Sequence, residues 1–499
     1  MNLEKLLDVI QEDFENNTDV DEKRKHGQFF TPISMAKEIT EYGVSLLKDN
    51  PVRFLEPAFG MGSFYYAVRN AIQDRTLLSI GIEQDDIIYQ KATDLWKTDN
   101  VQLLHEDFLS STIQEKQINL LITNPPYVRH HLIDSSRKDE LRKRVQKELG
   151  LEISGLAGLY CYVLLLSHRW LSLGAVSGWL IPSEFMDVNY GGCLKEYLLK
   201  QVRLVRIHRY NPADSQFDRA LVSSSVVWFV NEKSEEDYEV EFTFGGSHQN
   251  PERRKFVKKS VLLTEDKWTR FPEKDVRINT NQKTLKDYFD IKRGIATGDN
   301  SFFIMTLDQI KARKLDLKMF VPVLPSPRLL KTDEIFPDKD KYPVLSPQLF
   351  LLKCDLTKDQ VKKDYPNLWK YLKTGEDKTG NKYLCKNRKQ WFWQENRKAT
   401  PFLCSYMGRS KEGDGAPFRF ILNHSNAIVT NTYLMLYPKE DIQIKIDKDP
   451  TLVYQIWTYL RNISSDDFES EGRIYGGGLR KIEPKELGKV PCEALSRII

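Results

Sequence analysis

Four short apolar segments in the first 130 residues each end at a polar side chain, and this arrangement constrains the fold more than any other feature. The segments and the polar residues that follow them are 52–55 with Glu56, 77–82 with Glu83, 101–104 with Asp107 and 118–123 with Asn124. Short apolar runs separated by helical patterns are typical of strands that are buried on both faces of a parallel sheet. Parallel strands end at one edge of the sheet, and open α/β sheets bind ligands there. The sequence therefore predicts an α/β fold with a ligand pocket at that edge.

The turn after the first segment indicates what kind of ligand the pocket takes. Gly60 and Gly62 lie between the strand and a helical pattern that starts near Ser63, and a residue without Cβ lets a ligand approach the backbone. Glu83 follows Gly60 by 23 residues, which is the usual distance for an acidic residue that binds ribose hydroxyls. The chain lacks the G-x-x-x-x-G-K pattern and the third glycine of a dinucleotide fingerprint. These features favour a nucleoside ligand without a pyrophosphate.

Asp107 and Phe108 follow the third segment and suit the base of such a nucleoside. The carboxylate can accept a hydrogen bond from an adenine amino group, and the ring can stack on the base. Asp107 alone is equally typical of a turn or a helix N-cap.

The length and the charge of the chain indicate a second domain with another task. A chain of 499 residues exceeds the size of a single core, which rarely grows past about 250–300 residues. Residues 1–245 hold 27 Lys and Arg against 37 Asp and Glu, whereas residues 246–499 hold 47 against 33. We therefore expect a boundary between residues 245 and 246 and a basic second domain that meets a polyanion. A solvated lysine-rich surface is the alternative explanation.

Other features of composition narrow the class of protein. The six cysteines show no C-x-x-C pair and no zinc-like Cys/His spacing, so the sequence predicts no metal site. The N-terminus has acidic residues and no apolar core of a signal peptide, and no segment predicts a membrane span. We expect a protein of the prokaryotic cytoplasm.

Five motifs occur in an order that resembles a known family. They are GQFFTP (27–32), FLEPAFGMGSF (54–64), GIEQD (81–85), EDF (106–108) and NPPY (124–127). Over residues ~26–230 the chain resembles the gamma, TaqI-like class of S-adenosylmethionine-dependent DNA adenine-N6 methyltransferases, which are type II restriction-modification methylases. The resemblance implies a Rossmann-like class I methyltransferase domain with a mixed, mostly parallel seven-stranded sheet, followed by an α+β target-recognition domain. The chain departs from the family at Gly158, where members often carry Asp or Asn.

The resemblance also implies S-adenosyl-L-methionine as the cofactor and assigns residues to its parts. It places Thr31 at the methionine part, Glu56, Ala58 and Gly60 at the amino acid end, Glu83 at the ribose, and Asp107 and Phe108 at the adenine.

The sequence Asn124-Pro125-Pro126-Tyr127 suits chemistry on an amino group. The lone pair of an exocyclic adenine nitrogen is delocalised, so a catalyst must favour its pyramidal form. The side-chain oxygen of Asn124 and the carbonyl of Pro125 could each accept one N6 hydrogen, and proline rigidity would hold that carbonyl still. Tyr127 would stack on the base, and the resemblance assigns the second stacking ring to Phe217. The prolines could equally be a stop signal for the strand, and Phe217 a core aromatic.

We expect a monomeric, site-specific methyltransferase that flips an adenine out of double-stranded DNA and methylates its N6. Segments 285–304 and 475–487 resemble the ends of a target-recognition domain. Only 26 residues precede GQFFTP, so we expect a separate cognate restriction endonuclease. Two alternatives are an RNA or protein-glutamine N-methyltransferase and a non-catalytic DNA-binding specificity subunit.

Overall fold

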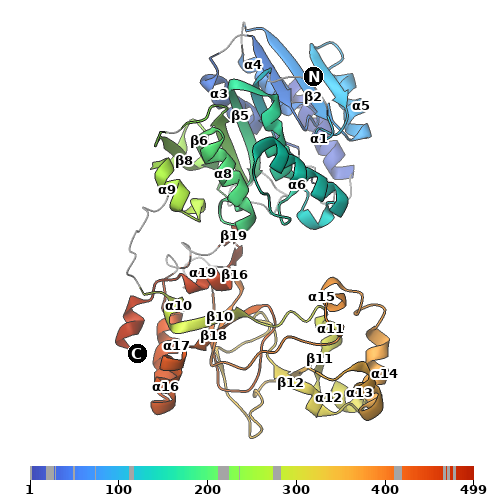
Figure 1. Ribbon diagram of the computed structural model, residues 1–499, viewed down its shortest axis with the longest axis vertical. Coiled ribbons are helices and arrows are strands. Elements are labelled where there is room, and N and C mark those ends of the chain that lie inside the picture. Colours follow the sequence, from blue (N-terminus) through green and yellow to red (C-terminus); the bar gives the residue numbers. More distant parts are fainter. Residues whose placement is uncertain are drawn as a thin grey trace. The chain divides into compact units, whose positions relative to one another are not determined.

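The computed structural model describes most of the chain as two compact units. The units are Met1–Arg277 and Ile278–Ile499, and each is described by itself (Figure 1). The described residues are 3–17, 27, 30–48, 51–72, 75–111, 117–211, 224–234, 236–272, 283–409, 418–464, 468, 473–475 and 479–499.

A nine-stranded sheet forms the centre of the first unit. Its spatial order is β3-β2-β1-β4-β5-β7-β6-β8-β9. The strands are β1 (Val52–Glu56), β2 (Leu77–Glu83), β3 (Val101–His105), β4 (Ile118–Thr123), β5 (Leu171–Pro182), β6 (Arg203–Arg209), β7 (Ser224–Val230), β8 (Glu239–Gly246) and β9 (Pro251–Lys258). The first five strands in this order are parallel, and β7 runs antiparallel to both of its neighbours. The predicted α/β class and its mostly parallel sheet are confirmed.

Helices cover both faces of this sheet. They are α1 (Leu3–Asn17), α3 (Ile33–Leu46), α4 (Ser63–Ala71), α5 (Asp86–Leu95), α6 (Ser135–Leu149), α7 (Leu159–Leu166), α8 (Gly192–Lys200) and α9 (Lys259–Thr264). All six residues of β4 are buried, and Leu120, Leu121 and Ile122 alternate between two cores. Leu120 and Ile122 pack in the core of α1, α3, α4 and α5, whereas Leu121 packs in the core of α6, α7 and α8. This alternation explains the continuous apolar run, because neither face of the strand meets water.

Two strands extend the sheet beyond the expected seven, and they move the domain boundary. β8 pairs with β6, and β9 pairs with β8 from Glu239 opposite Lys258 to Gly246 opposite Pro251. The division between the units therefore lies after Arg277 and not after residue 245. The change in charge sign near residue 246 reflects the basic, exposed strand β9 and not the end of the domain, because an edge strand carries charge without needing a boundary.

The second unit contains three smaller sheets with helices around them. The sheets have the orders β10-β18-β15-β17-β13, β11-β14-β12 and β16-β20-β19. The strands are β10 (Phe289–Arg293), β11 (Ile304–Thr306), β12 (Phe320–Val323), β13 (Glu334–Ile335), β14 (Leu349–Leu352), β15 (Phe402–Ser405), β16 (Met407–Arg409), β17 (Phe420–Asn423), β18 (Tyr433–Pro438), β19 (Arg473–Tyr475) and β20 (Leu479–Lys481). The helices are α10 (Leu285–Tyr288), α11 (Asn300–Phe303), α12 (Leu307–Ala312), α13 (Lys358–Asp364), α14 (Pro366–Gly375), α15 (Tyr383–Lys386), α16 (Glu440–Lys448), α17 (Leu452–Arg461) and α19 (Pro484–Gly488).

Three of the four aromatic residues in the basic segment 378–398 belong to the core of this unit. Phe392 is fully buried, and Trp391 and Trp393 pack against the same cluster. The exposed aromatic side chain of the segment is Tyr383, which is 74% exposed at the start of α15. No helix in the described parts of the chain is long and apolar enough to cross a membrane.

The revised boundary predicts how truncated chains behave. A chain that ends at residue 277 keeps the β8–β9 pair and should unfold cooperatively. A chain that ends at residue 245 loses β9, leaves β8 as an open edge and exposes the buried side chains of Val240 and Phe242. We expect the shorter chain to aggregate, and soluble yield with thermal unfolding checks this. Equal stability of the two chains would contradict the boundary.

Candidate cofactor and catalytic site

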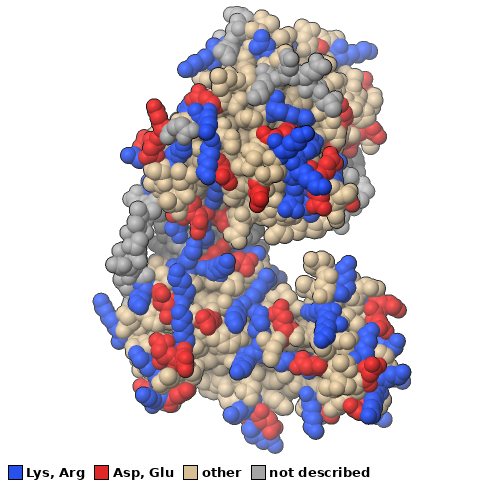
Figure 2. All heavy atoms as spheres, viewed as in Figure 1, with Lys and Arg blue, Asp and Glu red and all other residues tan. Residues whose placement is uncertain are grey.

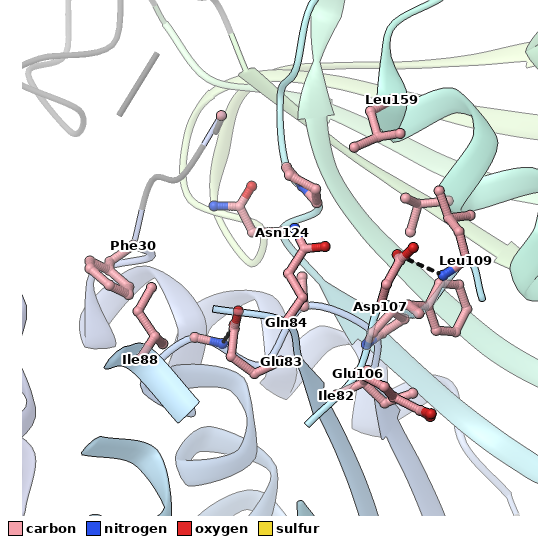
Figure 3. A pocket seen from close by; sticks show the side chains of 17 residues that line it. Phe30, Ile82, Glu83, Gln84, Ile88, Glu106, Asp107, Leu109, Asn124 and Leu159 are labelled. Carbon is pink, nitrogen blue, oxygen red and sulfur yellow. Dashed lines mark hydrogen bonds between the residues drawn. The ribbon is translucent and has the colours of Figure 1, made fainter. Parts of the chain in front are cut away.

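A pocket opens at the carboxyl ends of the strands in the first unit. Its empty volume is about 740 Å³, counted with the space that is open to solvent. Its walls come from the ends of β2, β3 and β4, from the turn after β1 and from α7 (Figure 3). The predicted position of the ligand pocket thus coincides with a cavity.

The backbone of Gly60 and the carboxylate of Glu83 form the floor of the pocket. Glu83 Oε2 accepts a hydrogen bond from the amide of Gly60 at 2.9 Å, and Oε1 accepts one from the amide of Asp85 at 2.9 Å. Gly60 has a φ of 54°, which residues with a Cβ rarely adopt. Each carboxylate oxygen has a second lone pair, so Glu83 can also accept hydrogen bonds from two hydroxyl groups of a ligand.

Glu56 ends β1 as a buried carboxyl group with an unsatisfied oxygen. Its side chain is 2% exposed, and Oε2 has no hydrogen-bond partner among the described residues. Burial raises the pKa of Glu56 well above its ordinary value, because a buried charge loses its hydration. Glu56 does not line the pocket wall itself, but it directly precedes Pro57 and Ala58, which do. A cationic group of a ligand would satisfy this oxygen.

Asp107 and Phe108, which follow the end of β3, form another part of the pocket wall. Asp107 Oδ1 accepts a hydrogen bond from the amide of Leu109 at 3.1 Å, and Oδ2 forms an ion pair with Arg137 of α6. Asp107 therefore stabilises a turn, which was the alternative explanation from the sequence, and it also lines the pocket. Phe108 is buried and stacks on Trp170, with ring centroids 5.4 Å apart.

Asn124 directly follows β4 and lines the pocket at its upper end in Figure 3. Its side-chain nitrogen donates a hydrogen bond to Thr31 Oγ1 at 3.1 Å. The carbonyl of Thr31 in turn accepts a hydrogen bond from Ser63 at the start of α4, and Ser63 accepts one from Gln11. The donor end of the amide is thus held by a chain of bonds that reaches back to α1.

Gly27 holds the backbone of the Asn124–Tyr127 segment. The amide of Tyr127 donates a hydrogen bond to the carbonyl of Gly27 at 3.0 Å. A Cβ on Gly27 would lie 2.5 Å from that amide nitrogen, and its φ of 64° also favours glycine. The hydroxyl of Tyr127 donates to the carbonyl of Leu180, and burial raises the pKa of Tyr127, so the hydroxyl keeps its proton. The aromatic ring of Tyr127 is therefore fixed at both ends.

The structure brings most of the predicted site residues together. Those that line the pocket are Ala58, Gly60, Glu83, Asp107, Phe108, Asn124 and Pro126. Four others adjoin residues of the wall without lining it, namely Thr31, Glu56, Pro125 and Tyr127. Phe217 lies outside the described residues.

Several wall residues were missed by the sequence analysis. They include Ile82, Gln84, Ile88, Leu109, Leu159 and Val163. Leu159 and Val163 lie on α7, which begins after Gly158, the position that departs from the family pattern. The apolar wall residues belong to no sequence motif. Gln84, in contrast, directly follows Glu83 at the end of β2, and this position could have identified it as a wall residue.

Two family profiles match successive parts of the chain. The Eco57I restriction-modification methylase profile matches residues 34–217, and the profile for the C-terminal domain of the type II methyltransferase M.Eco57I matches residues 258–498. The second match begins inside β9, which the structure assigns to the first unit.

Two curated relatives align over nearly the whole chain. Type II methyltransferase M.AccI of Acinetobacter calcoaceticus is 28% identical, and the alignment covers 96% of this chain and 87% of the relative. Type II methyltransferase M.XamI of Xanthomonas campestris pv. amaranthicola is 25% identical, with coverage of 95% and 86%. Among solved structures, the type IIL restriction-modification enzyme MmeI in complex with DNA shares the fold, with a TM-score of 0.58, 14% identity, and coverage of 96% of this chain and 71% of MmeI.

The fold and the pocket at the strand ends define an S-adenosylmethionine-dependent methyltransferase. The chain belongs to the type II restriction-modification methylases of the Eco57I kind and is a site-specific DNA methyltransferase.

The residues of the pocket fit S-adenosyl-L-methionine, the cofactor of this family. Glu56, next to the wall residues Pro57 and Ala58, would offer a buried, unsatisfied carboxylate oxygen to the cationic amino group, and Glu83 would offer lone pairs to ribose hydroxyls. The lack of a Cβ at Gly60 leaves the turn after β1 open to a ligand, since the nearest side chain to that position is Phe30 at 3.5 Å.

The raised pKa of Glu56 predicts how cofactor affinity depends on pH. The carboxylate attracts the cationic amino group only when it is ionised, so affinity should be full above the raised pKa and should fall as pH drops through it. The fall should begin at a higher pH than the ordinary Glu value of about 4.3 would give. Calorimetry at several pH values measures this.

Glu56→Gln should bind more weakly and lose this pH dependence. Glu106→Gln removes a carboxylate from the pocket wall and is the matched control, which should keep the dependence. An unchanged pH profile in Glu56→Gln would show that another group is responsible.

Proposed function

We propose that the protein transfers a methyl group to N6 of adenine in double-stranded DNA. The observation that carries the proposal is the position of Asn124, which follows β4 directly, lines the cofactor pocket and is held through its amide nitrogen by Thr31. The motif Asn124–Tyr127 resembles the catalytic motif of the gamma-class adenine-N6 enzymes. The match to type II methyltransferases supports a DNA substrate over RNA or protein.

The proposed chemistry depends on two hydrogen-bond acceptors. The side-chain oxygen of Asn124 and the carbonyl of Pro125 each accept one hydrogen of N6, which favours the pyramidal amino group and directs its lone pair away from them. The cofactor supplies a methyl group on a sulfonium, which is a strong electrophile. No base is needed before transfer, because the amino group loses its proton afterwards.

Preorganisation is what this chain adds to the reaction. Asn124 is fixed by the chain of bonds to Thr31, Ser63 and Gln11, and the backbone after it is fixed by Gly27. Acceptors that need not reorganise during the reaction stabilise developing charge effectively. Fixed positions also supply the alignment that methyl transfer needs.

The base must leave the DNA stack before it can reach this pocket. Flipping a nucleotide costs a few kcal/mol, which stacking on protein side chains offsets in part. Tyr127 is the proposed stacking ring, because its hydroxyl is anchored on Leu180 and Tyr160 packs against its face edge-on, with centroids 6.4 Å apart. Phe217 is proposed as the second ring from the resemblance alone.

The cofactor residues are proposed with the roles that the sequence suggested. Glu56, with Thr31, Ala58 and Gly60, would hold the methionine part, and Glu83 would bind the ribose. Asp107 and Phe108 would hold the adenine, with Arg137 keeping the Asp107 carboxylate in place through their ion pair.

Basic residues on α6 supply a DNA-facing surface beside the pocket. The helix carries Arg142, Lys143 and Lys147 as exposed side chains, and Figure 2 shows Lys and Arg gathered over it. Arg137 of the same helix contacts the pocket wall at Asp107. DNA that delivers a base to the pocket would therefore pass close to α6, where lysine side chains neutralise phosphates.

The second unit is proposed to recognise the target sequence. With the boundary after Arg277, residues 1–277 carry 36 Lys and Arg against 42 Asp and Glu, and residues 278–499 carry 38 against 28. The positive excess thus remains in the second unit after the boundary is corrected. Tyr383, exposed between Lys382 and Lys386, is the aromatic side chain best placed to meet DNA.

The biological role follows from the family. Methylation at a fixed site would protect the DNA of a prokaryotic cell against a separate endonuclease that cuts the same site, and a monomer in the cytoplasm suffices for this. A non-catalytic specificity subunit is disfavoured, because such a subunit has no need for a preorganised Asn124 beside a cofactor pocket.

Asn124→Ala should separate chemistry from binding. The lost acceptor acts mainly in the transition state, so single-turnover methylation should slow by about 100–1,000-fold or more. Affinities for DNA and for the cofactor should stay near those of the parent, and the product should be N6-methyladenine.

The exposed amide of Asn70 on α4 provides the control for this experiment. Asn70→Ala should methylate at the parent rate. The mechanism is wrong if Asn124→Ala also does so, or if the methyl group appears on cytosine.

Replacing two lysines of α6 tests the DNA surface. Lys143→Gln with Lys147→Gln should weaken DNA binding and should lower the slope of log affinity against log salt by about 2. The rate at saturating DNA should change little. Fluorescence anisotropy over a range of salt concentrations measures the DNA affinity and its salt slope, and a methylation assay at saturating DNA measures the rate.

Lys48 and Lys97 form a matched control pair. Both are exposed, and they precede β1 and β3, so they lie at the opposite edge of the sheet from the pocket. Glutamines at these two positions should leave the salt slope unchanged. If both double variants lowered the salt slope equally, α6 would have no specific contact with DNA, and the effect would come from the net charge of the protein.

A further inference from the structure

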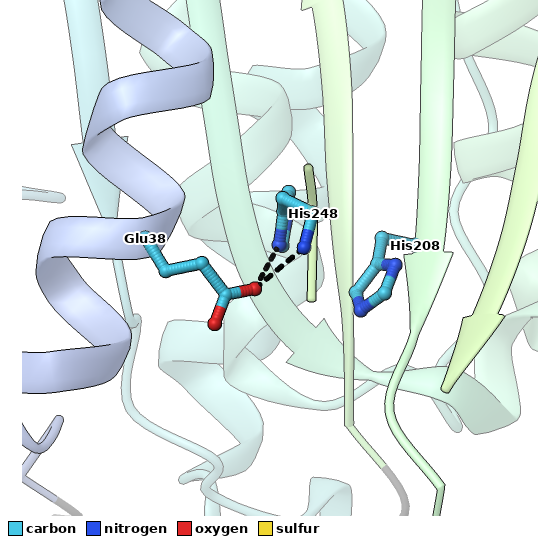
Figure 4. Close-up of side chains that lie close together, drawn as sticks. All are labelled: Glu38, His208 and His248. Carbon is cyan, nitrogen blue, oxygen red and sulfur yellow. Dashed lines mark hydrogen bonds and ion pairs between the residues drawn. The ribbon is translucent and has the colours of Figure 1, made fainter. Parts of the chain in front are cut away.

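Three potential metal ligands meet in the first unit, away from the cofactor pocket. They are Glu38 on α3, His208 on β6 and His248 in the turn between β8 and β9 (Figure 4). One ligand atom from each lies within 4.8 Å of the others. None of these three described side chains is among those that line the pocket.

Both imidazoles are buried with one nitrogen unsatisfied. His248 Nδ1 lies 3.0 Å from Glu38 Oε1, which also accepts a hydrogen bond from the His248 amide at 2.7 Å. His208 Nδ1 lies 2.9 Å from Thr243 Oγ1. Both rings are fully buried, and Nε2 of each has no partner among the described residues. The two rings are neighbours, with centroids 4.3 Å apart, and two buried nitrogens without partners on adjacent rings indicate that a ligand for them is missing.

A charged pair borders the two imidazoles. The guanidinium of Arg206 lies nearby, donates to the carbonyl of His248 and is paired with Glu241. Neither printed contact of Arg206 reaches the two unsatisfied imidazole nitrogens, and a neutral imidazole nitrogen is a good metal ligand.

We propose that Glu38, His208 and His248 bind a divalent first-row transition ion of the zinc class. Two imidazoles and one carboxylate are a common ligand set for zinc, with bond lengths near 2.0–2.2 Å. Ligand atoms of such a tetrahedral site lie about 3.4 Å apart, so three atoms that lie within 4.8 Å of one another need only small shifts to hold the ion. A water takes the fourth position.

The site ties one helix to the edge of the sheet. Glu38 comes from α3, which begins two residues after Thr31, whereas the two histidines come from β6 and from the β8–β9 turn. The ion therefore fixes the helix that follows the loop holding Asn124. Its role is structural, and it goes beyond the proposed methylation.

The metal content of the intact protein tests the proposal directly. Protein purified from zinc-supplemented medium and dialysed should retain about one zinc per chain by mass spectrometry. Zinc added to the stripped protein should raise the apparent Tm by about 5–10 °C at ~100 times its Kd. Cobalt in place of zinc should give the visible absorption of a tetrahedral site.

Variants locate the ion. His208→Ala and Glu38→Gln should each lose the retained zinc and the shift in Tm. His105→Gln is the matched control, because His105 forms a pair with Asp86 at 3.0 Å but belongs to no three-ligand cluster among the described residues. This control should keep both signals.

Two outcomes overturn the proposal, and neither depends on a variant that fails to fold. One is an intact protein that retains no zinc, shows no shift in Tm and gives no cobalt absorption. The other is zinc that a folded Glu38→Gln variant retains at the parent level, which would place the ion elsewhere.

Discussion

The contact between Gly27 and the backbone of Tyr127 is the constraint on which the site depends. The amide of Tyr127 reaches the carbonyl of Gly27 only because no Cβ stands between them. This contact joins two motifs that lie about 100 residues apart, and Asn124 reinforces it through Thr31. The strand supplies the position of the motif, whereas the N-terminal loop supplies its conformation. The segment that carries the proposed catalytic residues is therefore fixed from outside its own strand.

The buried carboxyl groups beside this loop have an energetic cost in the protein without its cofactor. Glu56 and Glu83 both have raised pKa values, because burial disfavours their charged forms. Glu83 recovers part of the cost through two backbone amides, but one oxygen of Glu56 has no partner among the described residues. A cationic ligand is the group that offsets such a cost. A cationic ligand that paired with Glu56 would therefore also raise the free energy of unfolding of the protein.

The strand ends were predictable from the sequence, because each combines a local pattern with a local signal. β1, β2, β3 and β4 begin and end within one residue of the predicted segments. Their polar end residues lie together since parallel strands share an edge. The place of the motif Asn124–Tyr127 at the pocket was equally predictable, because Asn124 directly follows β4 and the prolines are adjacent to it in the chain.

The remaining features depend on contacts between distant segments. Strand β9 was assigned to the second domain because its charge differs from that of the preceding residues, but its pairing with β8 decides where it folds. Leu159 and Val163 line the pocket only because α7 packs against it, and their apolar character is common to any helix. Phe217 lies outside the described residues, so its stacking role stays a prediction.

The cluster of Glu38, His208 and His248 also could not be predicted from the sequence, because it depends on contacts between distant segments. The ligands are separated by 170 and 40 residues, so no spacing rule for metal sites applies to them. They meet because β6 lies next to β8 and α3 covers that part of the sheet. His248 also lies beyond the boundary that charge alone suggested, so the error in the boundary hid one of the three residues. Topology, and not composition, creates this site.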